Sequence, residues 1–177
     1  MERILIIGNA GAGKSTLARL LADKTKLPLI HLDRLYWCGH WQHRSREEFD
    51  RLLQGELERP RWIIDGNFTR TIPKRLEYAD TVIFLDLPTL TCLWGITKRL
   101  LQNYGKTRQD MGGNCPEKWD KNKISLYRGV LTFRKQRRKN LLALLENKKG
   151  IQVLHFKSRK QAKKWLENFT ESFSTTP

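Results

Sequence analysis

Residues 8–16 carry the pattern of residue types most directly tied to chemistry in this chain. Their spacing fits G-x-x-x-x-G-K-S, in which glycines leave a row of backbone N–H groups unobstructed for an anion. An apolar run precedes the pattern at 4–7 and a helical period follows it, which is the context that phosphate binding requires. The pattern predicts an ATP-binding phosphate loop rather than a purely structural glycine-rich turn. Its members are Gly8, Asn9, Ala10, Gly11, Ala12, Gly13, Lys14, Ser15 and Thr16.

Two residues of this loop and one further carboxylate have expected roles toward ATP and Mg²⁺. Lys14 is expected to reach the β- and γ-phosphates, and the Ser15 hydroxyl to hold Mg²⁺. Asp65 follows the apolar run 62–64, a position suited to holding the same ion directly or through water. The alternative is that Asp65 only caps the turn that begins at Gly66. ATP and Mg²⁺ are therefore the expected cofactors.

Positive charge is concentrated in the second half of the chain. Residues 1–90 hold 14 Lys and Arg against 12 Asp and Glu, whereas residues 91–177 hold 20 against 6. One interpretation is a set of arginines that close over ATP among solvated lysines. The other is a nucleic-acid interface, because clustered cations bind the phosphate backbone. Charge alone leaves both open.

A segment without periodicity and the helix after it supply the candidate arginines. Residues 104–120 are rich in Gly, Asn and charge, which is typical of a lid. The next helix is expected over 121–147, with a buried stripe at Ile124, Tyr127, Leu131, Arg134, Arg138, Leu141 and Leu145. An arginine on a buried face needs an anion, so Arg134 and Arg138 are predicted to reach the γ-phosphate and Arg137 to point away. Alternatively, their stems only snorkel to solvent.

Apolar runs alternate with helical patterns along the chain, which indicates an α/β fold with a parallel sheet. Strands are expected at 4–7, 29–32, 62–64, 81–87 and 151–156. Helices are expected at 14–24, from Ser45 onward, at 91–103, at 121–147 and after Ser158. Asp33 and Arg34 come at the carboxyl end of the second strand, where ligands collect in such sheets.

Length and composition fit one domain, expected over 1–171, followed by a frayed tail at 172–177. An acceptor-side insertion is expected at about 34–60, with aromatic side chains that either stack on a base or pack a small lobe. Cysteine spacing shows no disulfide framework, and Cys38, His40 and His43 match no common zinc site. Apolar runs are too short to span a membrane, so the expected location is the cytoplasm.

The order of these motifs resembles the P-loop kinases of the adenylate kinase type and, more narrowly, the bacterial DNA topology modulation proteins related to FlaR. The chain departs from the adenylate kinase family after Asp65. The adenylate kinase pattern there is Asp-Gly-Phe-Pro-Arg, whereas this chain has Asp65-Gly66-Asn67-Phe68-Thr69, so the acceptor contacts of adenylate kinase do not transfer. The matching stretches are GNAGAGKST at 8–16, HLDRLYW at 31–37, WIIDGNF at 62–68, ADTVIFLDLP at 79–88 and RQDMGGNCPE at 108–117.

The resemblance implies a five-stranded sheet of order 2-3-1-4-5, an acceptor-side lobe around 33–57 and a lid near 104–120. It implies that Asp33 and Arg34 contact the acceptor, that Asp65 lies near Mg²⁺, and that Arg108 and Arg99 neutralise the transferring phosphoryl group. Trp37, Asp65 and Asn67 join the candidate acceptor contacts, and Asp33 is expected to orient or deprotonate the acceptor hydroxyl. The function expected from residues and resemblance together is transfer of the γ-phosphate of ATP to a small acceptor, such as a nucleotide or nucleoside. A nucleic-acid-associated ATPase, or a nucleotide-gated DNA-binding protein, is the alternative.

Overall fold

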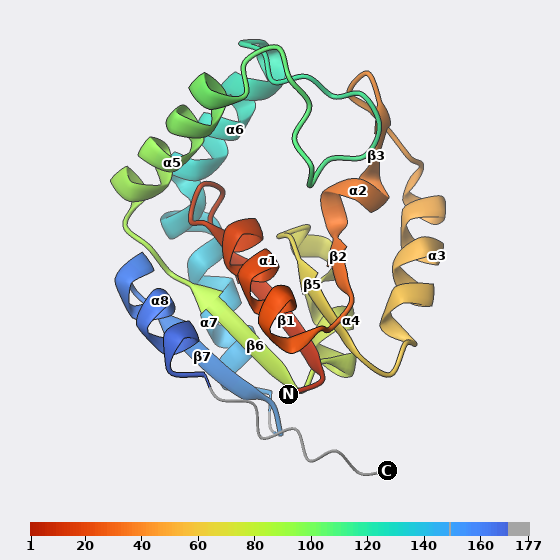
Figure 1. Cartoon of the computed structure of the whole chain (residues 1–177), viewed down its shortest axis with the longest axis vertical. Coiled ribbons are helices and arrows are strands. Elements are labelled where there is room, and N and C mark those ends of the chain that lie inside the picture. Colours follow the sequence, from red (N-terminus) through yellow and green to blue (C-terminus); the bar gives the residue numbers. More distant parts are fainter. Residues whose placement is uncertain (149, 170–177) are drawn as a thin grey trace.

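The computed structural model describes residues 1–148 and 150–169 and has an α/β fold in three layers (Figure 1). Five parallel strands form the central sheet in the order β2-β5-β1-β6-β7. This is the order 2-3-1-4-5 when the five strands are counted along the chain, so the predicted fold is confirmed. The tail predicted to fray, 172–177, lies outside the described residues.

The strands of the sheet are β1 (Arg3–Gly8), β2 (Leu29–His31), β5 (Trp62–Asp65), β6 (Thr81–Leu85) and β7 (Gln152–Phe156), and a separate antiparallel hairpin is formed by β3 (Trp37–Gly39) and β4 (Gln42–His43). The helices are α1 (Lys14–Thr25), α2 (Leu32–Tyr36), α3 (Arg46–Leu57), α4 (Ile72–Tyr78), α5 (Thr89–Gln102), α6 (Lys121–Phe133), α7 (Lys139–Glu146) and α8 (Arg159–Glu167).

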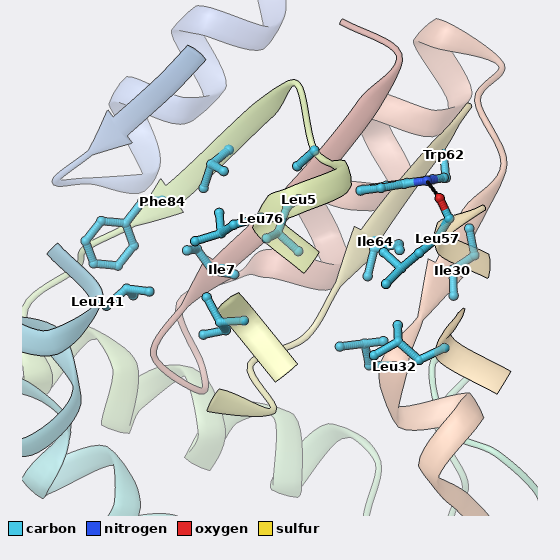
Figure 2. Close-up of a cluster of buried hydrophobic side chains, with 14 of the residues drawn as sticks. Leu5, Ile7, Ile30, Leu32, Leu57, Trp62, Ile64, Leu76, Phe84 and Leu141 are labelled. Atoms are coloured by element: carbon cyan, nitrogen blue, oxygen red, sulfur yellow. Dashed lines mark hydrogen bonds between the residues drawn. The ribbon is translucent and has the colours of Figure 1, made fainter. Parts of the chain in front are cut away.

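Apolar side chains from both faces of the sheet form two cores. One core packs the sheet against α3, α4 and α7, and the other packs it against α1, α5 and α8. Figure 2 shows the first core, in which Leu5 and Ile7 of β1 lie between Phe84 of β6 and Ile64 of β5. Burial of each such side chain stabilises the fold by about 1.5–3 kcal/mol. Because β1, β5 and β6 are covered on both faces, they appear in the sequence as continuous apolar runs, whereas the edge strand β7 is mostly exposed.

The strand predictions are confirmed within a few residues at each end, but the chain turns earlier than expected after β2. Leu32 is fully buried and begins α2, so Asp33 and Arg34 lie on a short helix rather than at the end of a strand. Asp33 occupies the first turn of that helix, where a carboxylate is favoured by the helix dipole.

The continuous helix predicted over 121–147 is interrupted by a π-helical turn at Arg134–Arg138. The extra residue in this turn shifts the buried face of α6 by one position relative to α7. Leu141 and Leu145 are buried as predicted, whereas Phe133 is buried in place of Arg134. Ile124 and Leu131 are 42% and 56% exposed, so the predicted stripe is wrong in α6.

The loop 104–120 crosses from the tops of α5 and α6 to the β3–β4 hairpin (Figure 1). His40 donates its backbone N–H to the carbonyl of Asn114 at 2.6 Å, and the Trp41 indole donates to the Pro116 carbonyl at 3.0 Å. Gly112 and Gly113 lie so close to the hairpin backbone that a Cβ on Gly112 would be 2.0 Å from the Trp37 carbonyl oxygen. The predicted lid is therefore packed on the predicted acceptor-side insertion.

Helix α4, which the sequence patterns did not predict, carries a fully buried arginine below the loop that follows β5. Arg75 donates to the carbonyls of Gly66, Asn67 and Phe68 and to the Thr71 hydroxyl. Burial lowers the pKa of Arg75 to about 9, although the charge of Asp65 opposes this shift. Arg75 thus fixes the backbone that positions Asn67.

Replacing Arg75 with Met should lower the free energy of unfolding by about 2–3 kcal/mol, because buried carbonyls lose their donors. Urea denaturation followed by circular dichroism measures this change. Lys74→Met is the matched control, since Lys74 is exposed on the same helix. Equal stability of the two variants would contradict the role assigned to Arg75.

Candidate functional site

A cavity of about 1640 Å³ lies at the carboxyl edge of the sheet. Its floor is formed by the loops that follow β1 and β5, which meet because these strands are neighbours. The loop 104–120 and the β3–β4 hairpin contribute side chains to its walls. Most candidate residues from the sequence line this cavity; Gly8, Arg34, Arg134 and Arg138 do not.

The phosphate loop enters α1 without a side-chain cap. Gly13 occupies the N-cap position with φ 102°, and the first N–H groups of α1 have no intrahelical partners. Gly8 and Gly11 also have positive φ values, and a Cβ on Gly11 would lie 2.1 Å from the Cys92 carbonyl oxygen. Only glycine fits this position, and the resulting loop directs helix N–H groups toward the cavity, as anion binding requires.

Three other elements hold the loop in place. Asn9 is buried and donates its side-chain amide to the Val130 carbonyl of α6 at 3.1 Å. Arg159, the first residue of α8, donates to the Gly11 carbonyl at 2.7 Å. On α5, a Cβ at Gly95 would lie 2.2 Å from the same carbonyl oxygen. The loop is thus fixed before any ligand arrives.

Ser15 and Asp65 form the polar centre of the cavity floor. The Ser15 hydroxyl donates to Asp65 Oδ2 at 2.6 Å, and His31 Nδ1 contacts the other carboxylate oxygen. Lys14 lies beside this pair and donates to the Asn9 carbonyl at 3.0 Å. Burial lowers the pKa of Lys14, while the carboxylates of Asp65 and Asp33 oppose that effect. A hydroxyl and a carboxylate oxygen are suitable Mg²⁺ ligands.

Asp33 projects into the cavity from α2. Its side chain is 40% exposed, and its ion-pair partner, Arg108 Nη2, is 4.0 Å away. Burial in the cavity raises the pKa of the Asp33 carboxyl, with Arg108 opposing and the charges of Asp65 and Asp110 adding to the rise. Asp33 can therefore accept a proton from a group placed between it and the loop.

Glu117, a buried carboxylate of loop 104–120, gathers three cations from this loop, α5 and α6. Its Oε1 lies 2.8 Å from Arg108 Nε and 3.5 Å from Arg99 Nε, and its Oε2 pairs with Lys123. Burial raises the pKa of Glu117, but Lys123 and the two arginines outweigh burial and hold the pKa below its ordinary value. Arg108 also pairs with Asp110 at 2.7 Å. Both predicted lid arginines thus line the cavity from one cluster.

Two predicted arginines do not line the cavity. Arg138 forms a bidentate ion pair with Asp86, which also accepts from His155, and Arg134 is exposed. Arg137, predicted to point away, lines the cavity instead. The one-residue shift of the π-helical turn explains this exchange, because it rotates α6 relative to the pattern assumed from the sequence.

The remaining acceptor-side candidates take different positions. Trp37 lines the cavity, whereas Arg34 is exposed and donates to the Gln109 carbonyl of the lid. Asn67 lines the cavity and accepts the backbone N–H of Gly8 at 3.2 Å, which links the two floor loops. Arg34 therefore holds the lid in this structure.

Sequence reasoning assigned no role to three residues of the site: His31, Glu117 and Arg159. His31 stands two residues before Asp33 at the end of a strand, a position that could have indicated it. Arg159 contacts a loop 148 residues away, which no local pattern reveals.

Two solved structures share the architecture of this chain. Shikimate kinase from Acinetobacter baumannii in complex with shikimate matches with a TM-score of 0.59 and 16% identity, over 94% of this chain and 92% of that chain. Shikimate kinase from Bacteroides thetaiotaomicron matches with a TM-score of 0.53 and 18% identity, over 94% of each chain. These likenesses show a P-loop α/β fold.

No family model matches the chain. No curated protein matches it either, so the resemblance to the DNA topology modulation proteins is not confirmed. Among the described residues, no helix is long and apolar enough to cross a membrane, and no group of three or more His, Cys, Asp or Glu is placed to hold a metal ion.

Replacing Glu117 with Gln should loosen the lid, because Arg99, Arg108 and Lys123 lose their shared counter-charge. Breaking a buried ion pair costs about 3 kcal/mol, which corresponds to roughly 100-fold faster local opening. Hydrogen exchange of the amides in 105–119 measures this change. Glu77→Gln, at an exposed site on α4, is the control, and unchanged exchange in Glu117→Gln would disprove the role of the cluster.

Proposed function

We propose that this chain is an ATP- and Mg²⁺-dependent phosphotransferase that transfers the γ-phosphoryl group to a small acceptor. The observation that carries the proposal is the uncapped N-terminus of α1, which opens into the cavity beside the Ser15–Asp65 hydrogen bond. The phosphate loop, the carboxylate at the end of β5 and the lid arginines form one donor site. The fold similarity to kinases supports the same activity class.

Little covalent chemistry is required of the protein in such a transfer, because positioning and charge neutralisation dominate. The α1 N–H groups and Lys14 bind the phosphates of ATP. Ser15 and Asp65 would supply two oxygen ligands for Mg²⁺. Bound there, Mg²⁺ neutralises charge on the β- and γ-phosphates. Arg99 and Arg108 stabilise the charge on the transferring group.

The acceptor half of the cavity is assigned to Asp33, Trp37 and Asn67, with Asp33 orienting the acceptor and receiving its proton. The lid, held by Arg34 of α2 and Trp41 of the hairpin, keeps water from the γ-phosphate and so limits ATP hydrolysis.

The basic second half of the chain fits this activity. Within the described part of the chain, eight of its Lys and Arg residues line the cavity, where they face the charge of ATP. A nucleic-acid partner, the alternative drawn from net charge, gains no support from the comparisons. The eight residues are Lys98, Arg99, Lys106, Arg108, Lys123, Arg137, Arg159 and Lys163.

Replacing Lys14 with Ala should weaken ATP binding by roughly 10- to 100-fold, because a charge-assisted contact to phosphate is lost. Isothermal titration with ATP measures the dissociation constant. Lys139→Ala removes an exposed charge from α7 and should leave ATP affinity unchanged. Wild-type affinity in Lys14→Ala would refute the donor site and, with it, the proposed function.

Replacing Asp65 with Asn should remove most of the gain in ATP affinity that Mg²⁺ gives the wild-type protein. Loss of one carboxylate ligand is expected to weaken the hold on Mg²⁺ by roughly tenfold or more. Titrations with ATP in Mg²⁺ and in EDTA provide the comparison. Asp23→Asn, an exposed site on α1, is the control, and a full Mg²⁺ effect in Asp65→Asn would rule out this ligand.

A further inference from the structure

We propose that the acceptor is an alcohol bearing a planar ring, with its hydroxyl at Asp33 and its ring against four aromatic side chains of the cavity. These side chains, called the aromatic wall below, are Tyr36, Trp37, Trp41 and Phe68. The inference rests on the proposed function and names the chemical class of acceptor that the proposed function leaves open.

The surroundings of Asp33 favour a hydroxyl as the reacting group. Among the described residues no side chain donates a hydrogen bond to its carboxylate, and Arg108 is 4.0 Å away, so its oxygens can accept a proton. A phosphate as the reacting group would bring negative charge toward Asp33, Asp65 and Asp110. Arg108 is assigned to the transferring group and is already paired with Asp110 and Glu117, so it would not also offset the charge of an acceptor phosphate. A neutral hydroxyl carries no such charge.

The transfer to a hydroxyl balances without any further reactant. A lone pair of the acceptor oxygen forms the new bond to the γ-phosphorus. The bond between that phosphorus and the β,γ-bridging oxygen breaks, and ADP leaves with the electron pair. The hydroxyl proton passes to the Asp33 carboxylate, and the product is a phosphate monoester.

The aromatic wall is continuous and begins one helical turn from Asp33. Asp33 and Tyr36 are three residues apart on α2 and share a face of the helix. The ring centroid of Tyr36 lies 4.9 Å from that of Trp37 and 5.0 Å from that of Phe68. The ring centroids of Trp37 and Trp41 are 5.2 Å apart. A ring attached near the reacting hydroxyl therefore reaches the wall.

Core packing does not account for the two tryptophans of the wall. Tyr36 and Phe68 also pack on the core beside the sheet, but Trp37 and Trp41 belong to neither core. The Trp41 indole is held by the Pro116 carbonyl, whereas the Trp37 side chain makes ring contacts with Tyr36, Trp41 and His43 and, within the described part of the chain, no hydrogen bond. Trp37 is thus the wall residue best placed to contact a ligand. Stacking of a planar ring on one aromatic side chain stabilises a complex by about 1–3 kcal/mol.

The test compares matched acceptors with ATP labelled at the γ-phosphate. Adenosine and uridine carry a ring and a hydroxyl, their 5′-monophosphates offer a phosphate oxygen, and ribose lacks the aromatic ring. We expect kcat/KM for the nucleosides to exceed that for the monophosphates and for ribose by at least tenfold. Phosphorus NMR should identify the product as a monoester. Preferred transfer to the monophosphates, equal transfer to ribose, or no transfer to either nucleoside would overturn the inference.

Variants of Trp37 test the wall independently of product chemistry. Trp37→Leu should raise the KM for the nucleoside at least tenfold with a smaller effect on kcat, and Trp37→Phe should restore most of the loss. Trp94→Leu, 61% exposed on α5 outside the cavity, should have no effect. An unchanged KM in Trp37→Leu would overturn the claim that the aromatic wall contacts the acceptor ring. The proposed function is judged separately by ATP binding of Lys14→Ala, so the two failures are distinguishable.

Discussion

The hydrogen bond between the Ser15 hydroxyl and Asp65 joins two parts of the site that lie 50 residues apart in the sequence. It forms because β1 and β5 are adjacent parallel strands, with Ile6 paired to Asp65 in register, so their following loops meet at one edge. His31 reaches the same carboxylate from β2, the next strand outward. Strand order therefore determines which side chains meet at this edge of the sheet. The loops that follow the strands set the distances between those side chains.

Several parts of this arrangement were predictable from the sequence because they depend on local rules. The glycines at 8–13, the doubly buried strands and the Ser45 cap each have a sequence pattern, and the structure has them in place. The α6–α7 region was predictable only in part: the period gave the buried face of α7, but an inserted residue at Arg134–Arg138 shifts the face of α6. Contacts such as Arg159 with Gly11 depend on tertiary packing and have no local pattern.

Net charge was a weak predictor of which cations line the cavity, because it does not show which charges are paired. Glu117 is nearly inaccessible to solvent, yet it holds three cations at the cavity wall. Asp86 similarly holds Arg138 and His155 away from the cavity. Glu117 thus gathers three cations that line the cavity, whereas Asp86 holds Arg138 at the end of β6.

The contact between loop 104–120 and the β3–β4 hairpin limits how far apart these two segments of the cavity wall can lie. His40 and Trp41 adopt positive φ angles at the hairpin turn, and the backbone of 112–114 lies directly against this hairpin. A Cβ at Gly113 would lie 2.6 Å from the Gly39 Cα. The glycines at these positions therefore set the spacing between loop 104–120 and the hairpin, because even one methyl group at Gly112 or Gly113 would push the two segments apart.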